Sequence, residues 1–186
     1  MDFLRKIYSF LIDTVQTLLL VFAVFLAIYV FLFRPFQVSG DSMRPTFHNK
    51  QYILTNLIVL KFEKPKLGDV IVFKAPPSPE KDYIKRVIGV PGDTVNLNDG
   101  RVYRNGNLLD ESKYLNSSVK TYGGSFLSEG NPVTVPSDSY LVMGDNRSGS
   151  SDSREWGFVP EKNVIGQSLF VYWPLNRMEI ISNPYK

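Results

Sequence analysis

A serine and a lysine stand in two polar segments that interrupt an otherwise apolar, strand-like sequence. The first segment is SGDSMRPT (39–46), and the second is DYIKRVIGVPGD (82–93). A serine hydroxyl is a weak nucleophile and reacts only beside a base. Glycine before Ser42 and proline after it are typical of a bent loop whose backbone N–H groups converge on a developing oxyanion. From this segment alone, an ordinary turn serine is the alternative interpretation of Ser42.

Lys85 is the candidate base, because its apolar neighbours Ile84, Val87 and Ile88 indicate a strand close to a buried surface. A lysine in water has a pKa of about 10.4 and is almost wholly protonated at neutral pH. Lowering that pKa to about 7 costs about 4–5 kcal/mol, and burial against apolar groups can supply it. In a regular strand, Arg86 points to the opposite face. The alternative is a lysine exposed to solvent on the strand surface.

Histidine and cysteine offer few other routes to catalysis. His48 is the single histidine, six residues after Ser42, and a Ser-His-Asp triad would have to use it. Such a triad needs a carboxylate to aim the ring back at Ser42, and we expect an exposed loop histidine instead. The chain has no cysteine, which excludes disulfides, thiolate nucleophiles and cysteine-based metal sites. No His, Asp and Glu set has metal-ligand spacing, so we expect no metal and no cofactor.

A third polar segment, GDNRSGSSDSREWGFVP (144–160), also joins charged side chains to glycines in a way that no packing pattern requires. The three polar segments are therefore candidate parts of one site.

The overall charge is nearly balanced, since 21 basic and 18 acidic residues give a net charge of only +3. The basic residues are scattered rather than gathered in one stripe, which argues against a nucleic-acid binder.

An uncharged run near the N-terminus predicts a membrane anchor. Residues 14–33 read TVQTLLLVFAVFLAIYVFLF, and a helix of twenty residues spans about 30 Å, the thickness of the bilayer core. A cleavable signal peptide is the competing interpretation. Its apolar region is normally about 7–15 residues long and ends in a small-x-small site, whereas this run passes into Arg34 and Pro35. The basic residues on the two flanks are nearly balanced and do not decide the orientation.

The remainder of the chain predicts an all-β domain. Short runs rich in β-branched and aromatic residues, separated by Gly, Pro, Asn and Asp, occupy 52–60, 69–73, 83–90, 94–97, 139–144 and 168–173. Residues 102–109 indicate a hairpin with Asn105-Gly106 in a type I′ turn. We expect residues 110–131 to form a polar surface excursion, and 74–81 to form a loop held open by three prolines.

Taken together, these segments closely resemble the conserved boxes of bacterial type I signal peptidases. The boxes are the anchor, SMRPT (42–46), GDVIVF (68–73), YIKR (83–86), and GDNR through GFVP (144–160). The resemblance implies the β fold that signal peptidases share with self-cleaving Ser–Lys repressors, preceded by one transmembrane helix. It divides the chain into a short cytoplasmic N-terminus (1–13), an anchor (14–33) and an extracytoplasmic peptidase domain (34–186).

The resemblance also implies residue roles that spacing alone does not assign. Ser42 matches the nucleophile, Lys85 the general base, and Ser150 the serine that orients the lysine. Asp152 with Arg154, and Asp145 with Arg86, match two supporting ion pairs. The family lines its substrate groove at positions that correspond here to Phe36, Val38, Met43, Tyr83 and Ile84.

One position departs from part of the family. Some members carry a serine two places before the nucleophile that adds a hydroxyl to the oxyanion hole, and this chain has Gly40 there. The loss of one oxyanion donor typically costs about 10²–10³ in rate. Glycine resembles the Gram-positive branch, in which the hole depends on the Ser42 N–H and another main-chain donor.

The resemblance implies a serine endopeptidase that cuts signal peptides from preproteins after an A-x-A site, through an acyl-enzyme. Its partners are then signal peptides, the lipid bilayer and the nearby export translocon, with no nucleic acid. A soluble self-cleaving Ser–Lys protein is one alternative, and residues 14–33 argue against it. A membrane-tethered β module that binds signal peptides without cutting is the other, and the presence of Ser42 and Lys85 argues against that.

Overall fold

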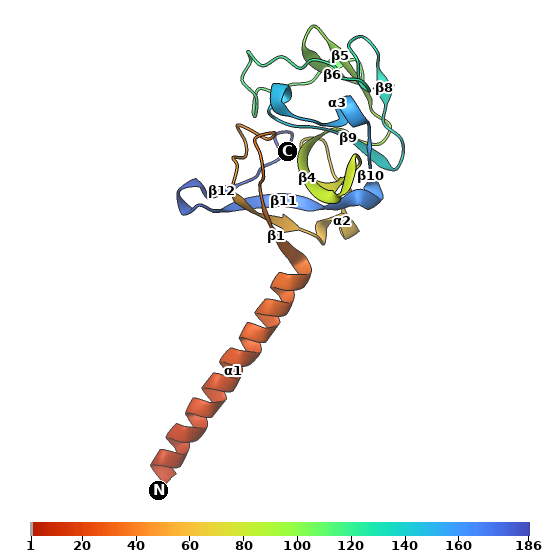
Figure 1. The fold of residues 1–186 in the computed structure, drawn as a ribbon. Coiled ribbons are helices and arrows are strands. Elements are labelled where there is room, and N and C mark those ends of the chain that lie inside the picture. The colour runs from red at the N-terminus through yellow and green to blue at the C-terminus, as the bar shows by residue number, and fades with distance from the viewer. Residues whose placement is uncertain (1) are drawn as a thin grey trace.

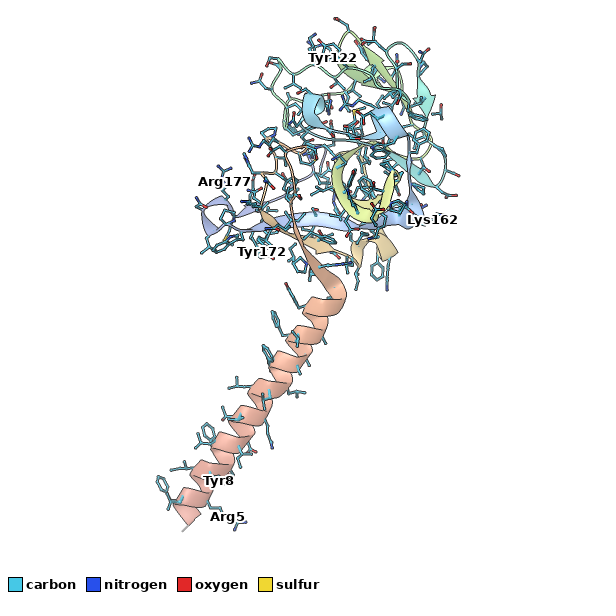
Figure 2. The ribbon with its side chains drawn as sticks, in the orientation of Figure 1. Arg5, Tyr8, Tyr122, Lys162, Tyr172 and Arg177 are labelled. Atoms are coloured by element: carbon cyan, nitrogen blue, oxygen red, sulfur yellow. The ribbon has the colours of Figure 1, made fainter. Side chains whose placement is uncertain are left out.

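The computed structural model describes residues 2–186, and its first element is a single long helix, α1 (Asp2–Leu32). The stretch Phe3–Ala27 is long and apolar enough to cross a membrane, and none of it is buried against the rest of the protein. The helix projects from the domain (Figure 1), and Figure 2 places Arg5 and Tyr8 near its far end. It begins before the run at 14–33, because Arg5, Lys6 and Asp13 do not interrupt a helix. Phe33, which we assigned to the anchor, is the first residue of a strand.

The remaining residues form a mostly β domain, as the sequence predicts. Its helices are α2 (Val59–Phe62) and α3 (Ser153–Trp156), with short 3₁₀ turns η1 (Arg147–Gly149), η2 (Glu161–Asn163) and η3 (Leu175–Arg177). Its strands are β1 (Phe33–Gln37), β2 (Tyr52–Asn56), β3 (Val70–Ala75), β4 (Ser78–Gly89), β5 (Thr94–Asn98), β6 (Arg101–Arg104), β7 (Asn107–Leu108), β8 (Val133–Thr134), β9 (Ser139–Met143), β10 (Val159–Pro160), β11 (Val164–Trp173) and β12 (Glu179–Ile180).

The strands form two antiparallel sheets. The larger has the order β1-β2-β11-β3-β4-β9-β10, with β12 paired to β11, and the smaller has the order β7-β6-β5-β8. The larger sheet continues directly from the anchor through β1, and the smaller lies at the opposite end of the domain (Figure 1). The predicted hairpin is present as β6 and β7, and positive φ angles at Asn105 and Gly106 agree with a type I′ turn. Lys85 lies on β4 and Ser42 lies between β1 and β2, and all three strands belong to the larger sheet, which is the sheet nearer the anchor.

Two loop and strand assignments from the sequence are wrong. Residues 57–60 do not continue β2, because the chain turns after Asn56, whose side chain accepts the N–H groups of Ile58 and Val59 at the start of α2. The prolines at 74–81 do not hold a loop open. Only Pro76 and Pro77 lie between β3 and β4, and Ala75 pairs with Ser78 across a bulged hairpin. Proline is accepted there because a turn and a bulge do not require its missing N–H.

The segment 110–131 is irregular, as expected, but it is not merely a surface excursion. Leu115 and Leu127 are buried, and Leu127 joins the core beneath the smaller sheet. Glu111 forms an ion pair with the buried guanidinium of Arg147, which also donates to Thr121. These contacts pack the segment against the loop that follows β9.

Candidate active site

The loop that carries Ser42 connects β1 to β2 and is fixed at both ends. The N–H of Val38 donates to Gln51 O, and that of Lys50 donates to Val38 O, both at 2.8 Å. Met43 and Phe47 are fully buried in the core between them. Gly40 has a φ of +90°, a conformation that side-chain-bearing residues rarely adopt. Buried anchors and one left-handed glycine thus set the position of Ser42.

Lys85 reaches this loop from β4. Its Nζ lies 2.7 Å from Ser42 Oγ, and its side chain is only 4% exposed. Among residues 2–186, the Ser42 hydroxyl is the hydrogen-bond partner of this amine, and Lys85 forms no ion pair. The contact therefore joins a serine hydroxyl to an amine that no carboxylate neutralises directly.

Burial lowers the pKa of Lys85 to about 8, because desolvation disfavours the charged ammonium. The carboxylates of Asp152 and Asp145 oppose this shift, whereas the guanidinium of Arg154 adds to it. At neutral pH roughly a tenth of the amine is then neutral and able to accept a proton, against less than a thousandth for a lysine in water. The environment thus makes Lys85 a usable base.

Arg86 points to the opposite face of β4, as the strand period predicts. It donates to both oxygens of Asp145, at 2.9 and 2.7 Å, and to Gly68 O at 2.9 Å. The Thr46 hydroxyl donates to the same carboxylate at 2.5 Å. Arg86 and Asp145 are both almost completely buried. This pair therefore connects three segments: β4, the Ser42 loop and the loop after β9.

Asp152 and Arg154 form a second buried ion pair beside the dyad. The Asp152 carboxylate accepts two guanidinium N–H bonds at 2.8 Å, and it also accepts the backbone N–H groups of Arg154 and Gly144. It is the N-cap of α3. The pair holds the 144–154 loop in the shape that brings it close to Lys85.

Ser150 lies in this loop, and its Oγ is buried without a hydrogen bond to any described residue. The expected hydrogen bond to Lys85 is thus not formed in this structure. Position 144 can only be glycine, because a Cβ there would collide with Ser150 Oγ and Ser42 O. Glycine at position 144 thus allows Ser150 Oγ and Ser42 O to lie close to the same point of the backbone.

A groove of about 540 Å³ opens beside the dyad. Ser42 and Lys85 line it, together with four of the five predicted groove residues: Phe36, Val38, Tyr83 and Ile84. Met43 does not line it. This residue is 1% exposed and packs in the core with Val38, Phe47 and Ile53. Sequence reasoning missed further lining residues, namely Gln37, Ser39, Ile53, Val72, Lys81, Asp82 and Ser151.

His48 is half-buried and lies in the same loop, six residues after Ser42. Burial, followed by the charges of Arg177 and Arg44, lowers the pKa of its imidazole. The Ser42 hydroxyl is hydrogen-bonded to Lys85 and, within residues 2–186, to no histidine. The geometry thus favours a Ser–Lys arrangement over a triad built on His48.

Comparison with known proteins identifies the family of this chain. The model of the family "Signal peptidase, peptidase S26" matches residues 11–173. A signal peptidase I from Leptolyngbya laminosa is 37% identical over 96% of this chain and 88% of its own length. Signal peptidase I S from Bacillus subtilis (strain 168) is 40% identical over 86% of this chain and 88% of its own length. Signal peptidase IB from Staphylococcus aureus (strain MRSA252) is 33% identical over 94% and 95%, respectively.

The fold, the site and these matches define a serine endopeptidase. The chain belongs to the signal peptidase family, peptidase S26, whose members of type I include Gram-positive forms. Its reaction is the cleavage of signal peptides, and its substrates are preproteins that carry them. The apolar helix α1 is consistent with a membrane anchor.

Proposed function

We propose that this peptidase works through a Ser–Lys dyad, with Ser42 as the nucleophile and Lys85 as the general base. The observation that carries the proposal is the 2.7 Å contact between Lys85 Nζ and Ser42 Oγ, together with the almost complete burial of Lys85. Burial lowers the pKa of the amine to about 8, so it can take the serine proton near neutral pH.

The reaction then passes through an acyl-enzyme. Neutral Lys85 accepts the Ser42 proton while Oγ attacks the carbonyl carbon of the scissile peptide bond. When the tetrahedral intermediate collapses, the C–N bond breaks and the leaving amine takes the proton from Lys85. Lys85, neutral again, then removes a proton from water while the water oxygen attacks the carbonyl carbon of the ester. The bond between that carbon and Ser42 Oγ breaks, Oγ takes the proton back from Lys85, and the signal peptide leaves as a carboxylic acid.

Backbone amides stabilise the oxyanion in this scheme. Within the described residues the Ser42 N–H donates to no protein acceptor, which leaves it available for the substrate oxygen. The Gly40 N–H is not available in the same way, because it donates to Asn49 Oδ1 at 3.1 Å. The roles of the two ion pairs are supportive: Asp152–Arg154 and Asp145–Arg86 hold the loops around the dyad. Ser150 is proposed to orient Lys85, because its buried hydroxyl forms no hydrogen bond with any described residue and is free to bond to the amine.

The groove supports specificity for small residues before the scissile bond, the A-x-A pattern. It lies between β1, which is an edge strand, and residues 82–85 of β4, which pair with β3 but lie beyond the β9 ladder. An extended peptide can therefore bond to free main-chain groups on either side. Phe36, Val38, Tyr83 and Ile84 narrow the space for its side chains.

The dyad is tested with purified full-length chain and a preprotein substrate. Ser42→Ala and Lys85→Met are each expected to lower turnover by about 10⁴-fold or more, since each removes one half of the reacting pair. Ser168→Ala, which alters a buried serine on β11, and Lys66→Met, which alters an exposed lysine, are the controls and should stay within a few-fold of native. Near-native turnover of a folded Lys85→Met protein contradicts the dyad.

We also propose that the N-terminus is cytoplasmic and that the domain lies outside, near the translocon, where signal peptides emerge. The anchor holds the groove at the bilayer surface, because β1 follows α1 without a linker. The chain has no cysteine, so single cysteines at Arg5 and at the exposed Lys162 can report the topology. A membrane-impermeant maleimide should label Lys162→Cys but not Arg5→Cys in intact spheroplasts. The reverse pattern contradicts the orientation.

A further inference from the structure

Asn146 connects the loop after β9 to the nucleophile loop through two hydrogen bonds. Its backbone N–H donates to Ser42 O at 3.0 Å, and its side-chain amide donates to Asp41 O at 3.1 Å. These acceptors are the carbonyls of the two peptide units that flank Ser42. One residue from a distant part of the chain thus holds the backbone on both sides of the nucleophile.

The bond to Asp41 O has a direct consequence for the Ser42 N–H. The peptide between residues 41 and 42 is trans, and in a trans peptide the C=O and the N–H point in opposite directions. When the Asn146 amide holds the carbonyl on one side, the N–H of the same unit points to the other. That N–H donates to no acceptor among residues 2–186, and the Ser42 side chain lines the groove.

The residues that follow Asn146 fix its position. Gly149 leaves room for its amide, because a Cβ at position 149 would lie 2.6 Å from Asn146 Nδ2. The Gly149 N–H also donates to Asn146 O at 3.0 Å. The next residue, Arg147, is buried and donates to Gly144 O at 3.1 Å and to Thr121. A side chain fixed in this way can transmit a fixed direction to the peptide that it holds.

We propose that Asn146 is a positioning residue that aims the Ser42 N–H at the oxyanion of the tetrahedral intermediate. The inference rests on the proposed role of Ser42 as the nucleophile. Asn146 is not among the residues that line the groove and forms no hydrogen bond with Lys85 within residues 2–186, so it acts through the 41–42 peptide. The oxyanion forms only along the reaction path and not when the substrate binds. Removal of the Asn146 amide should therefore lower kcat and leave KM almost unchanged.

The test compares Asn146→Ala and Asn146→Asp with the native full-length chain. Asp keeps the size of the side chain but replaces the donor with a carboxylate that cannot bond to Asp41 O. In each variant we expect kcat to fall by about 10–100-fold, less than the loss of a whole oxyanion donor, with KM within twofold. Asn163→Ala is the matched control, since its amide donates to Lys74 O away from the site. Its kcat should stay within twofold of native.

Two peptide ligands separate positioning from a general loosening of the site. A substrate-sequence peptide aldehyde forms a tetrahedral adduct with Ser42 and places an oxygen in the oxyanion hole, whereas the corresponding peptide alcohol only occupies the groove. Asn146→Ala should weaken the aldehyde by about the same factor as kcat and leave the alcohol within twofold. Native kcat, or equal weakening of both ligands, overturns the inference. If Ser42→Ala retains turnover, the dyad proposal itself fails; if Ser42→Ala is inactive while Asn146→Ala is normal, only the role of Asn146 fails.

Discussion

Two neighbouring cations on β4 are buried in opposite ways. Lys85 and Arg86 are 4% and 2% exposed, respectively, and point to opposite faces of the same strand. Arg86 is held by both oxygens of Asp145, whereas the hydrogen-bond partner of Lys85 is a neutral hydroxyl. Burial of a charge is costly unless the charge is paired or given up. Arg86 is paired, and Lys85 gives up its proton more easily.

This difference separates a residue that stabilises the fold from one that is ready to react. A guanidinium stays protonated in any protein, so pairing is the available solution for Arg86. An ammonium can release its proton when it is desolvated, and burial lowers the pKa of Lys85 to about 8 at the expense of stability. The same strand thus contains a paired cation and, beside it, the amine that we propose as the general base.

The largest expected effect comes from breaking the paired cation. Asp145→Ala leaves Arg86 buried without its carboxylate and should lower the free energy of unfolding by about 3–5 kcal/mol. Chemical denaturation of the full-length chain in detergent measures it. Glu63→Ala removes an exposed pair with Lys66 and should cost no more than about 1 kcal/mol. Equal costs for the two variants would contradict the buried role of Asp145.

The unpaired cation should behave in the opposite way. Lys85→Met is expected to raise the free energy of unfolding at pH 7 by up to about 3 kcal/mol, because it removes an ammonium whose burial disfavours the folded state. The gain should be full below pH 8 and shrink as pH rises toward 10.5, since the native pKa is about 8 and the unfolded value is 10.5. Arg86→Met, the matched variant on the other face, should destabilise the fold. A loss of stability in both variants would remove the contrast.

The pH dependence of the rate should show the same pKa of Lys85 as the pH dependence of the stability. As pH rises from 6 to 8, kcat/KM is expected to increase by roughly 50-fold, and then by about twofold more before it levels off above about pH 9, because the free enzyme reacts with Lys85 neutral and its pKa is about 8. Initial rates with a peptide substrate from about pH 6 to about pH 10 measure the profile. A midpoint near the ordinary value for histidine would implicate His48 instead.

A smaller shift should follow from Asp152→Asn. The Asp152 carboxylate is the leading group that raises the pKa of Lys85 against burial, and Arg154 acts in the opposite direction. Without the carboxylate charge, the rate midpoint should move to lower pH, by about one unit or less. Asp93→Asn, which loosens a pair with Arg104 away from the dyad, should leave the midpoint in place. A midpoint that rises would contradict the electrostatic role of Asp152.

Local patterns in the sequence predicted the β domain, the anchor-like helix and the alternation of Lys85 and Arg86. The hairpin at Asn105-Gly106 could also be predicted, because these two residues determine the turn type. The burial of Met43 beneath the groove residues Phe36, Val38 and Ile84 was not evident from the sequence, because the resemblance names positions but does not say how deeply a loop side chain is buried. The proline-rich hairpin was missed because two prolines can close a turn as well as hold one open.

Long-range contacts were beyond the sequence for a different reason. Glu111 meets Arg147, and Asn146 meets Asp41, across 36 and 105 positions of the chain, respectively. Nothing in the residues near either partner signals these pairs, because they depend on how the two loops pack against the sheets. The role inferred for Asn146 therefore depends on the folded structure and not on any local sequence pattern.

The most direct test is the titration of the Lys85 amine itself. Lysine side chains labelled with ¹³C at Cε can be followed by NMR in the full-length chain, with the Lys85 signal assigned by its absence from Lys85→Met. We expect a midpoint near pH 8, well below that of solvent-exposed lysines. A midpoint near 10.5 would mean a charged, hydrated ammonium at neutral pH and would contradict Lys85 as the base.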